Sequence, residues 1–214
     1  MAEPGAAWTS GERPNSVAAL PSGLAGRFGG WMMSLMNRSE QRQVLELAAV
    51  APGESVLEVG HGPGVLLGEL VTSTKAGRIV GLDPSPEMRA ATARRTAEAM
   101  ANDRVRIEEG TAAATGQPSD SFDVVLSVNT VAIWPDLAAG VRELARVLRP
   151  TGRLLLSWHG GTAPTRMARM LVLPEEQLGR IEAALAAEFG SVRRLRTAHC
   201  EVFRAAEGAD RLPE

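Results

Sequence analysis

A short apolar segment that runs into three glycines limits the fold of this chain more than any other feature. Residues 55–59 are mostly apolar, with Glu58 near their end, which predicts a buried strand. Glycines follow at alternate positions, namely Gly60, Gly62 and Gly64. The apolar residues of 65–70 then recur at a spacing that suits a helix. A strand that turns through glycines into a helix brings bare backbone N–H groups and a helix N-terminus against a ligand.

An acid follows the second predicted strand, 78–82, at a distance typical of nucleoside-binding sites. Asp83 lies about 20 residues past Gly64, where a carboxylate can grip both hydroxyls of a ribose. The fingerprint of nicotinamide dinucleotide sites does not fit, because its register would place Val65 or Leu67 at the third glycine. The sequence therefore predicts a nucleoside cofactor of another kind.

Predicted strands and helices alternate along the chain, which is typical of an α/β fold. The predicted strands are 55–59, 78–82, 104–108, 122–128, 152–158, 191–196 and 198–204, and the predicted helices are 23–37, 39–50, 64–74, 85–101, 137–148 and 174–189. The central strands are apolar without alternation, so helices should cover both faces of a parallel sheet. The last two strands follow each other without a helix, which predicts an antiparallel pair. Ser85 and Asp136 should cap the helices that follow them.

Composition excludes several classes of protein. The chain has 214 residues, 44% of them hydrophobic, and a net charge of −2, which suits one domain and gives no overall attraction to nucleic acid. Cys200 is the only cysteine and there are three histidines without ligand spacing, so neither an internal disulfide nor a metal site is expected. No apolar run could cross a bilayer and no export signal is visible, so we expect a cytoplasmic protein without a membrane partner.

Four segments, in the right order, resemble the class I S-adenosylmethionine-dependent methyltransferases of the small-molecule type. They are the glycine loop 58–64 and the segments 80–88, 121–129 and 147–156. The resemblance implies a Rossmann-like, doubly wound sheet of seven mostly parallel strands, with an antiparallel last pair and helices on both faces. It also implies S-adenosylmethionine as cofactor and S-adenosylhomocysteine as product.

The resemblance gives the residues of the first two strand ends roles toward this cofactor. Backbone N–H groups from Gly60 through Gly62 to Gly64 would hold the methionine carboxylate, because glycine lets a ligand approach the main chain closely. Glu58 or nearby carbonyl groups would accept from the ammonium group. Asp83 would take both ribose hydroxyls in charge-assisted hydrogen bonds.

Further cofactor contacts are expected around the adenine. Pro84 and Met88 would flank the ring. Asn129, at the end of the fourth strand, is also expected to bind the cofactor. In the family an acid in a Gly-Asp-Ala segment often accepts from the adenine amino group. This chain has Thr111 and Ala112 there, and a hydroxyl is the weaker acceptor.

The methyl acceptor is expected beyond the carboxyl ends of the fourth and fifth strands. His159, at the end of the fifth, is the candidate general base because imidazole titrates near neutrality; a packed histidine is the alternative. Trp31, Met32, Trp134 and Trp158 are predicted to line the pocket, with plain packing the alternative for Trp134. Asp123, Cys200 and the arginines of 193–196 are interpreted as structural or solvated groups.

The predicted organisation is a tail without fixed structure over 1–16, one methyltransferase domain over 17–204, and a frayed tail over 205–214. Residues 17–50 are predicted to form a helical lid, with a helix packed on the sheet as the alternative. The short link between the fifth strand and the helix at 174–189 leaves no large substrate-binding insertion, which favours a small molecule, such as a secondary metabolite.

Other functions stay open at this point. A peptide or protein acceptor also fits a lightly covered site, and a non-catalytic partner subunit that binds the cofactor fits the absence of an obvious base. The segment 129–132 lacks the Asn/Asp-Pro-Pro-aromatic tetrad of nucleic-acid amino-methylating enzymes, so no nucleic-acid partner is expected. The oligomeric state, a homodimer included, is left open.

Overall fold

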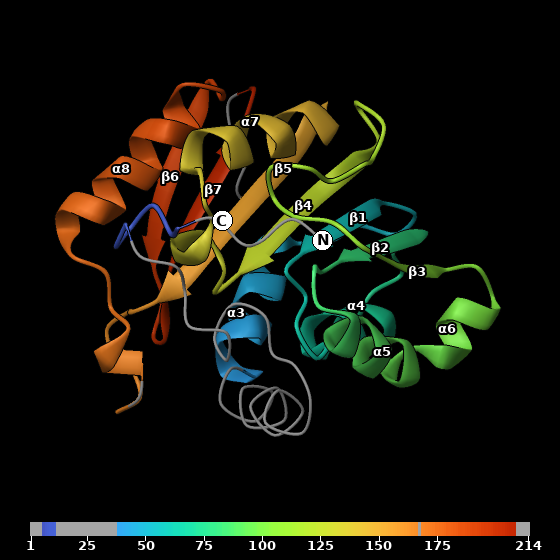
Figure 1. Cartoon of the computed structure of the whole chain (residues 1–214). Coiled ribbons are helices and arrows are strands. Elements are labelled where there is room, and N and C mark those ends of the chain that lie inside the picture. The colour runs from blue at the N-terminus through green and yellow to red at the C-terminus, as the bar shows by residue number, and fades with distance from the viewer. Residues whose placement is uncertain (1–5, 12–37, 167, 209–214) are drawn as a thin grey trace.

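The computed structural model describes residues 6–11, 38–166 and 168–208. One seven-stranded sheet has the order β3-β2-β1-β4-β5-β7-β6 (Figure 1). Its strands are β1 (Ser55–Val59), β2 (Arg78–Leu82), β3 (Val105–Glu108), β4 (Phe122–Val128), β5 (Leu148–His159), β6 (Ser191–Arg196) and β7 (Cys200–Ala206). The predicted helix 23–37, with Trp31 and Met32, lies outside the described residues, as does most of the predicted lid.

Strand pairing confirms the predicted fold class. Strands β1 to β5 pair in parallel, so the carboxyl ends of β1, β2, β4 and β5 lie at one edge of the sheet. Strand β7 runs antiparallel to both of its neighbours, β5 and β6. This topology places Glu58, Asp83, Asn129 and His159 at or just beyond the same edge, because each ends or follows a parallel strand.

Helices cover both faces of the sheet. They are α3 (Arg38–Ala48), α4 (Val65–Ser73), α5 (Pro86–Arg95), α6 (Ala97–Ala101), α7 (Leu137–Val147) and α8 (Glu175–Ala186). Helices α7 and α8 pack on one face, and α3, α4 and α6 pack on the other (Figure 1). Successive β4 side chains alternate between the two cores: Val125 joins the first, and Val124 and Leu126 join the second. Both faces are therefore apolar, as the unbroken apolar runs predicted.

Helix boundaries differ from the prediction where side chains compete with the backbone. The single helix predicted over 85–101 is two helices, broken at Thr96. The Thr96 hydroxyl donates to the Thr92 carbonyl at 3.0 Å, and such back-bonding bends or interrupts a helix. The predicted caps are confirmed, since Ser85 Oγ accepts from the Met88 N–H at 3.3 Å and Asp136 Oδ1 accepts from the Ala139 N–H at 2.9 Å.

Replacing Asp136 by alanine is expected to lower the free energy of unfolding by about 1 kcal/mol, because the first turn of α7 loses its acceptor. Asp136→Ser keeps an oxygen at this position and should recover most of the loss. Urea denaturation of the three proteins measures the difference. Equal stability of the alanine variant and the wild type would contradict the cap's contribution.

Residues 6–11, which fall within the predicted tail over 1–16, dock on the folded chain. The Trp8 indole N–H donates to the Val131 carbonyl at 2.7 Å, and its backbone N–H donates to the Trp134 carbonyl at 3.0 Å. Arg180 lies over the indole ring, 4.8 Å from its centroid. Strand β7 continues through Ala206, the second residue of the predicted C-terminal tail. A large aromatic ring with a hydrogen-bonded N–H can anchor even a Gly- and Pro-rich segment.

Candidate functional site

The glycine loop has a backbone that only glycine adopts without strain. Gly60, Gly62 and Gly64 have φ values of 75°, 53° and 75°. A Cβ on Gly60 would lie 2.5 Å from Thr130 Cγ2, and one on Gly64 would lie 2.5 Å from Thr92 Cγ2. A Cβ on Gly62 would meet nothing within 4 Å. Packing therefore demands glycine at the first and third positions, while the second borders open space.

The N–H groups of the loop are engaged within the protein, which differs from their predicted role toward a carboxylate. Gly60 donates to the Leu82 carbonyl at 2.7 Å, and Gly64 donates to the His61 carbonyl at 3.0 Å. Gly62 donates to Asp83 Oδ2 at 2.8 Å. The helix α4 begins directly after Gly64, which provides no side-chain cap. Its first-turn N–H groups are therefore the main-chain donors that suit an anionic group beside the loop.

Two buried carboxylates meet at the ends of β1 and β2. Asp83 accepts from the Ser85 N–H at 2.9 Å in addition to Gly62, whereas Glu58 Oε2 is buried with no hydrogen-bond partner. Burial, and then the charge of Asp83, raises the pKa of Glu58 well above its ordinary value. Burial likewise raises the pKa of Asp83. Within the described residues neither carboxylate forms a salt bridge, since Arg89 donates to the carbonyls of Asp83 and Pro84 instead.

This arrangement suits a cationic ligand that carries hydrogen-bond donors. An ammonium group can satisfy the orphaned Glu58 oxygen and offset its charge, and hydroxyl groups can share the Asp83 carboxylate, each oxygen of which has a second lone pair. S-adenosylmethionine has an ammonium, a sulfonium and two ribose hydroxyls. The residues present therefore fit the cofactor that the sequence predicts. The described residues contain no group of three or more His, Cys, Asp and Glu side chains that could hold a metal ion.

His61 supports the loop from inside. Its ring is buried, with Nδ1 2.8 Å from the Gly62 carbonyl oxygen and 3.0 Å from Thr92 Oγ1. Burial lowers the pKa of His61, so the ring is held neutral. The Thr92 hydroxyl also donates to the Gly62 carbonyl at 3.0 Å. These contacts tie the loop to α5.

A second cluster joins the ends of β4 and β5. Asn129, with a left-handed φ of 57°, follows β4 directly and donates from Nδ2 to Glu40 Oε2 at 2.6 Å. Asn129 Oδ1 is buried without a partner. His159 Nδ1 lies 3.2 Å from Glu40 Oε1. Glu40 is 2% exposed and comes from α3.

Sequence reasoning missed Glu40, although a signal exists. Glu40, Val44 and Ala48 are spaced four residues apart, so they share the buried stripe of α3. A carboxylate on an apolar stripe is unusual unless it has a partner. The pattern alone could not name His159 and Asn129 as its partners, because both lie about 90 to 120 residues away in sequence.

The two described tryptophans of the predicted acceptor pocket fill the core on the α7–α8 face. The Trp158 indole N–H donates to the Leu171 carbonyl at 2.6 Å, and that of Trp134 donates to Thr130 Oγ1 at 3.1 Å. Trp158 and His159 are consecutive in β5, so their side chains leave opposite faces of the sheet. The structure therefore brings His159 together with Glu40 and Asn129, and separates it from the tryptophan core.

The residues predicted around the adenine have mixed positions. Met88 is buried in the first turn of α5, and Pro84 is exposed just before it. Thr111 is exposed in a short turn where it bridges to Ala114, while Ala112 is buried in the α7–α8 core.

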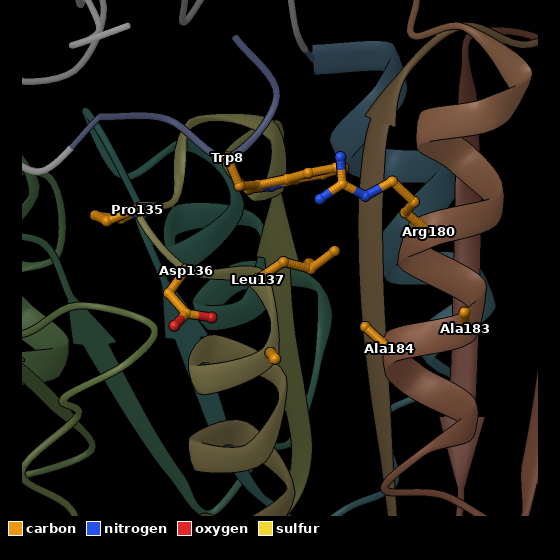
Figure 2. A pocket seen from close by; sticks show the side chains of 8 residues that line it. Trp8, Pro135, Asp136, Leu137, Arg180, Ala183 and Ala184 are labelled. Carbon is orange, nitrogen blue, oxygen red and sulfur yellow. The ribbon is translucent and has the colours of Figure 1, made fainter. Parts of the chain in front are cut away.

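A surface hollow of about 340 Å³ lies elsewhere, between the start of α7 and α8. Figure 2 shows the Arg180 guanidinium beside the Trp8 ring at this place. The hollow shares no residue with the carboxylates of β1 and β2 or with the Glu40 cluster.

Asp123, at the opposite edge of the sheet, accepts from the Ser55 N–H at 2.8 Å and pairs with Arg149 at 2.6 Å, so its role is structural, as predicted. Cys200 is a free, buried residue of β7, also as predicted.

None of the helices in the described residues is long and apolar enough to cross a membrane.

Comparison with known proteins agrees with the geometry at the strand ends. The family model described as "Methyltransferase domain" matches residues 56–152. Nocamycin O-methyltransferase of Saccharothrix syringae is 35% identical over 153 residues, which cover 71% of this chain and 53% of that protein.

Two further similarities extend this result. Demethylmenaquinone methyltransferase of Mycolicibacterium gilvum is 32% identical over 150 residues, covering 68% of this chain and 60% of that protein. The chain thus spans little more than half of either of these curated relatives. The structure of Haemonchus contortus phosphoethanolamine N-methyltransferase 2 in complex with S-adenosyl-L-methionine superposes with a TM-score of 0.68 at 15% identity, over 85% of this chain and 57% of that one, which is a likeness of fold. The matches to a methyltransferase domain over residues 56–152 and to two curated methyltransferases agree with the resemblance of this chain to the class I S-adenosylmethionine-dependent methyltransferases.

Proposed function

We propose that this protein transfers a methyl group from S-adenosylmethionine to an oxygen, nitrogen or carbon atom of a small molecule, such as a secondary metabolite. The observation that carries the proposal is the pair of buried carboxylates, Glu58 and Asp83, one of which keeps an orphaned oxygen. Such a site costs stability without a cation and gains it with one. The names of the two curated relatives, a nocamycin and a demethylmenaquinone methyltransferase, support a small-molecule acceptor.

Each end of the cofactor has a matching group in this chain. Glu58 Oε2 receives the ammonium, and Asn129 Oδ1 is a second buried acceptor at the neighbouring strand end. Asp83 holds the ribose hydroxyls, and the first-turn N–H groups of α4 suit the carboxylate. Pro84 and Met88 lie where the chain leaves β2, close in sequence to the Asp83 carboxylate, and flank the adenine.

When bound, the cofactor supplies a methyl group on a sulfonium, which an acceptor atom displaces in line. The chain contributes alignment of the two reactants and exclusion of water. His159 takes the proton that an oxygen or nitrogen acceptor loses, because it is the titratable side chain at the end of β5. Its ring lies on the α3 face of the sheet, so the acceptor approaches from that side.

Asp83→Ala is expected to weaken binding of S-adenosylhomocysteine by roughly 1.5–3 kcal/mol, or about 10- to 150-fold in Kd, because a buried charge-assisted contact is lost. Isothermal titration calorimetry measures the change. Asp123→Ala is the matched control, since it removes a structural carboxylate at the opposite edge of the sheet. Unchanged affinity of a folded Asp83→Ala variant would remove Asp83 from the site.

The acceptor class has its own experiment. Incubation with methyl-labelled S-adenosylmethionine and a bacterial extract, followed by acid precipitation, separates labelled small molecules from labelled protein. The proposal expects the label in the soluble, low-mass fraction. Label in the precipitate would favour a protein acceptor, and cofactor binding without any label would favour a non-catalytic partner subunit.

A further inference from the structure

We propose that Glu40 is a positioning residue that fixes His159 in the tautomer with the proton on Nδ1 and so presents Nε2 as the base. The role in methyl transfer rests on the proposed function, whereas the tautomer itself does not. The observation is a single buried carboxylate that bonds to the ends of two neighbouring strands, through Asn129 and through His159.

The proton positions follow from the chemistry of the three groups. The Asn129 Nδ2 group can only donate, so Glu40 Oε2 must accept from it at 2.6 Å. Glu40 stands in the first turn of α3, and each of its carboxylate oxygens contacts a nitrogen atom. An ionised carboxylate has no proton to give, so the 3.2 Å contact requires a proton on His159 Nδ1. The neutral ring then carries its lone pair on Nε2.

The same reasoning orients the amide of Asn129. Because its nitrogen faces Glu40, its oxygen points the other way, and this Oδ1 is buried without a partner. Glu40 therefore orients two groups. It directs the Nε2 atom of His159 toward the acceptor, and the unpaired Oδ1 atom of Asn129 toward a donor on the cofactor. A carboxylate that only stabilised the fold would not need to leave that oxygen unpaired.

The element that holds Glu40 is itself fastened along the sheet. Arg153 of β5 donates to the carbonyls of Ala48 and Ala49 at 2.6 and 2.9 Å, and Arg204 of β7 donates to that of Leu47 at 2.9 Å. These bonds hold the C-terminal end of α3, while Glu40 holds its N-terminal end. A catalytic group is positioned best from such a rigid support.

Among the residues that the structure describes, the groups beside the ring offer it no other anionic partner of this kind. Cys200 pairs with His159 across β5 and β7, but burial raises the pKa of its thiol to about 11, so it stays neutral. The carboxylate of Glu201 is engaged by Arg194 and Arg196 at 3.0 and 2.5 Å. Glu40 is therefore the group that sets the tautomer.

Long-range ¹⁵N–¹H correlation spectra of histidine-labelled protein test the proposal. The chain has three histidines, so a His159→Gln variant assigns the signals of His159. The wild type should show His159 with its proton on Nδ1. Glu40→Gln, whose amide can donate to Nδ1, should move the majority of the population to the Nε2–H tautomer. Glu46→Gln, an exposed substitution on the same helix, should leave the wild-type pattern unchanged.

Three results would overturn the proposal: an Nε2–H tautomer in the wild type, the same tautomer in wild type and Glu40→Gln, or an equal shift in the Glu46→Gln control. The first of these does not depend on Glu40→Gln, so the test stands even where that variant does not fold. Calorimetry of the wild type with S-adenosylhomocysteine is run on the same sample. Absence of binding in that titration would reject the proposed function. The NMR spectra would still show whether Glu40 determines the tautomer of His159.

Discussion

Gly64→Ala is expected to lower the free energy of unfolding by about 2–5 kcal/mol. A left-handed φ of 75° strains alanine, and the added Cβ would lie 2.5 Å from both Oγ1 and Cγ2 of Thr92. Displacing Thr92 would also break its contacts with His61 and the Gly62 carbonyl. The variant therefore loses the packing of α5 against the loop as well as the backbone conformation. Urea denaturation, followed by far-ultraviolet circular dichroism, measures the loss.

Gly62→Ala is the matched control in the same loop. Gly62 also has a positive φ, of 53°, but a Cβ there would meet nothing within 4 Å. The expected loss is about 1–2 kcal/mol, from backbone strain alone. Equal losses for the two variants would show that the contact with Thr92 does not matter, and would contradict the packing described here.

Glu58→Gln is expected to stabilise the ligand-free protein and to weaken cofactor binding. The carboxylate of Glu58 is buried with an orphaned oxygen, so ionising it costs about 1–3 kcal/mol that a neutral amide avoids. The same change removes the charge that attracts the ammonium group, and the Kd for S-adenosylhomocysteine should rise more than about tenfold. Thermal unfolding and calorimetry measure the two effects. Glu98→Gln, an exposed substitution on α6, should change neither.

The effect of Glu58 depends on pH with a definite sign. The pKa of Glu58 is raised in the folded protein, so between the ordinary value of 4.5 and the folded pKa the native state keeps a proton that the unfolded chain has released. Stability of the wild type therefore falls as pH rises through this window, and the advantage of Glu58→Gln grows with it. Ammonium binding should expel the retained proton, so the binding enthalpy should vary with the ionisation enthalpy of the buffer. A wild type that gains stability relative to Glu58→Gln as pH rises would contradict the argument.

Local signals in the sequence were enough to predict most of the fold. Apolar runs without alternation predicted a sheet with helices on both faces, because neither face of such a sheet is exposed to solvent. Ser85 and Asp136 were predictable as caps, since a cap and its helix are neighbours in sequence. The break at Thr96 was not, because it depends on whether one hydroxyl turns back to a carbonyl.

The site was less predictable, because its hydrogen bonds join distant parts of the chain. The glycines signalled a ligand loop, but only the folded chain shows that Gly62 donates to Asp83, 21 residues away. Glu40 meets His159 across 119 residues, and Trp8 meets Val131 across 123. Such pairs follow from how helices are laid on the sheet, and periodicity in one segment carries no information about them.

The position of β7 has a consequence for how the chain reaches this structure during synthesis. Because β7 lies between β5 and β6, every residue up to His199 can emerge from the ribosome while one side of β5 remains an open edge and β6 has no neighbour. An apolar strand with unpaired amides is prone to associate with other nascent chains. Strand β7 fills the position between β5 and β6 only when residues 200–206 have been made. Truncation before residue 200 should therefore yield aggregates rather than a smaller folded protein.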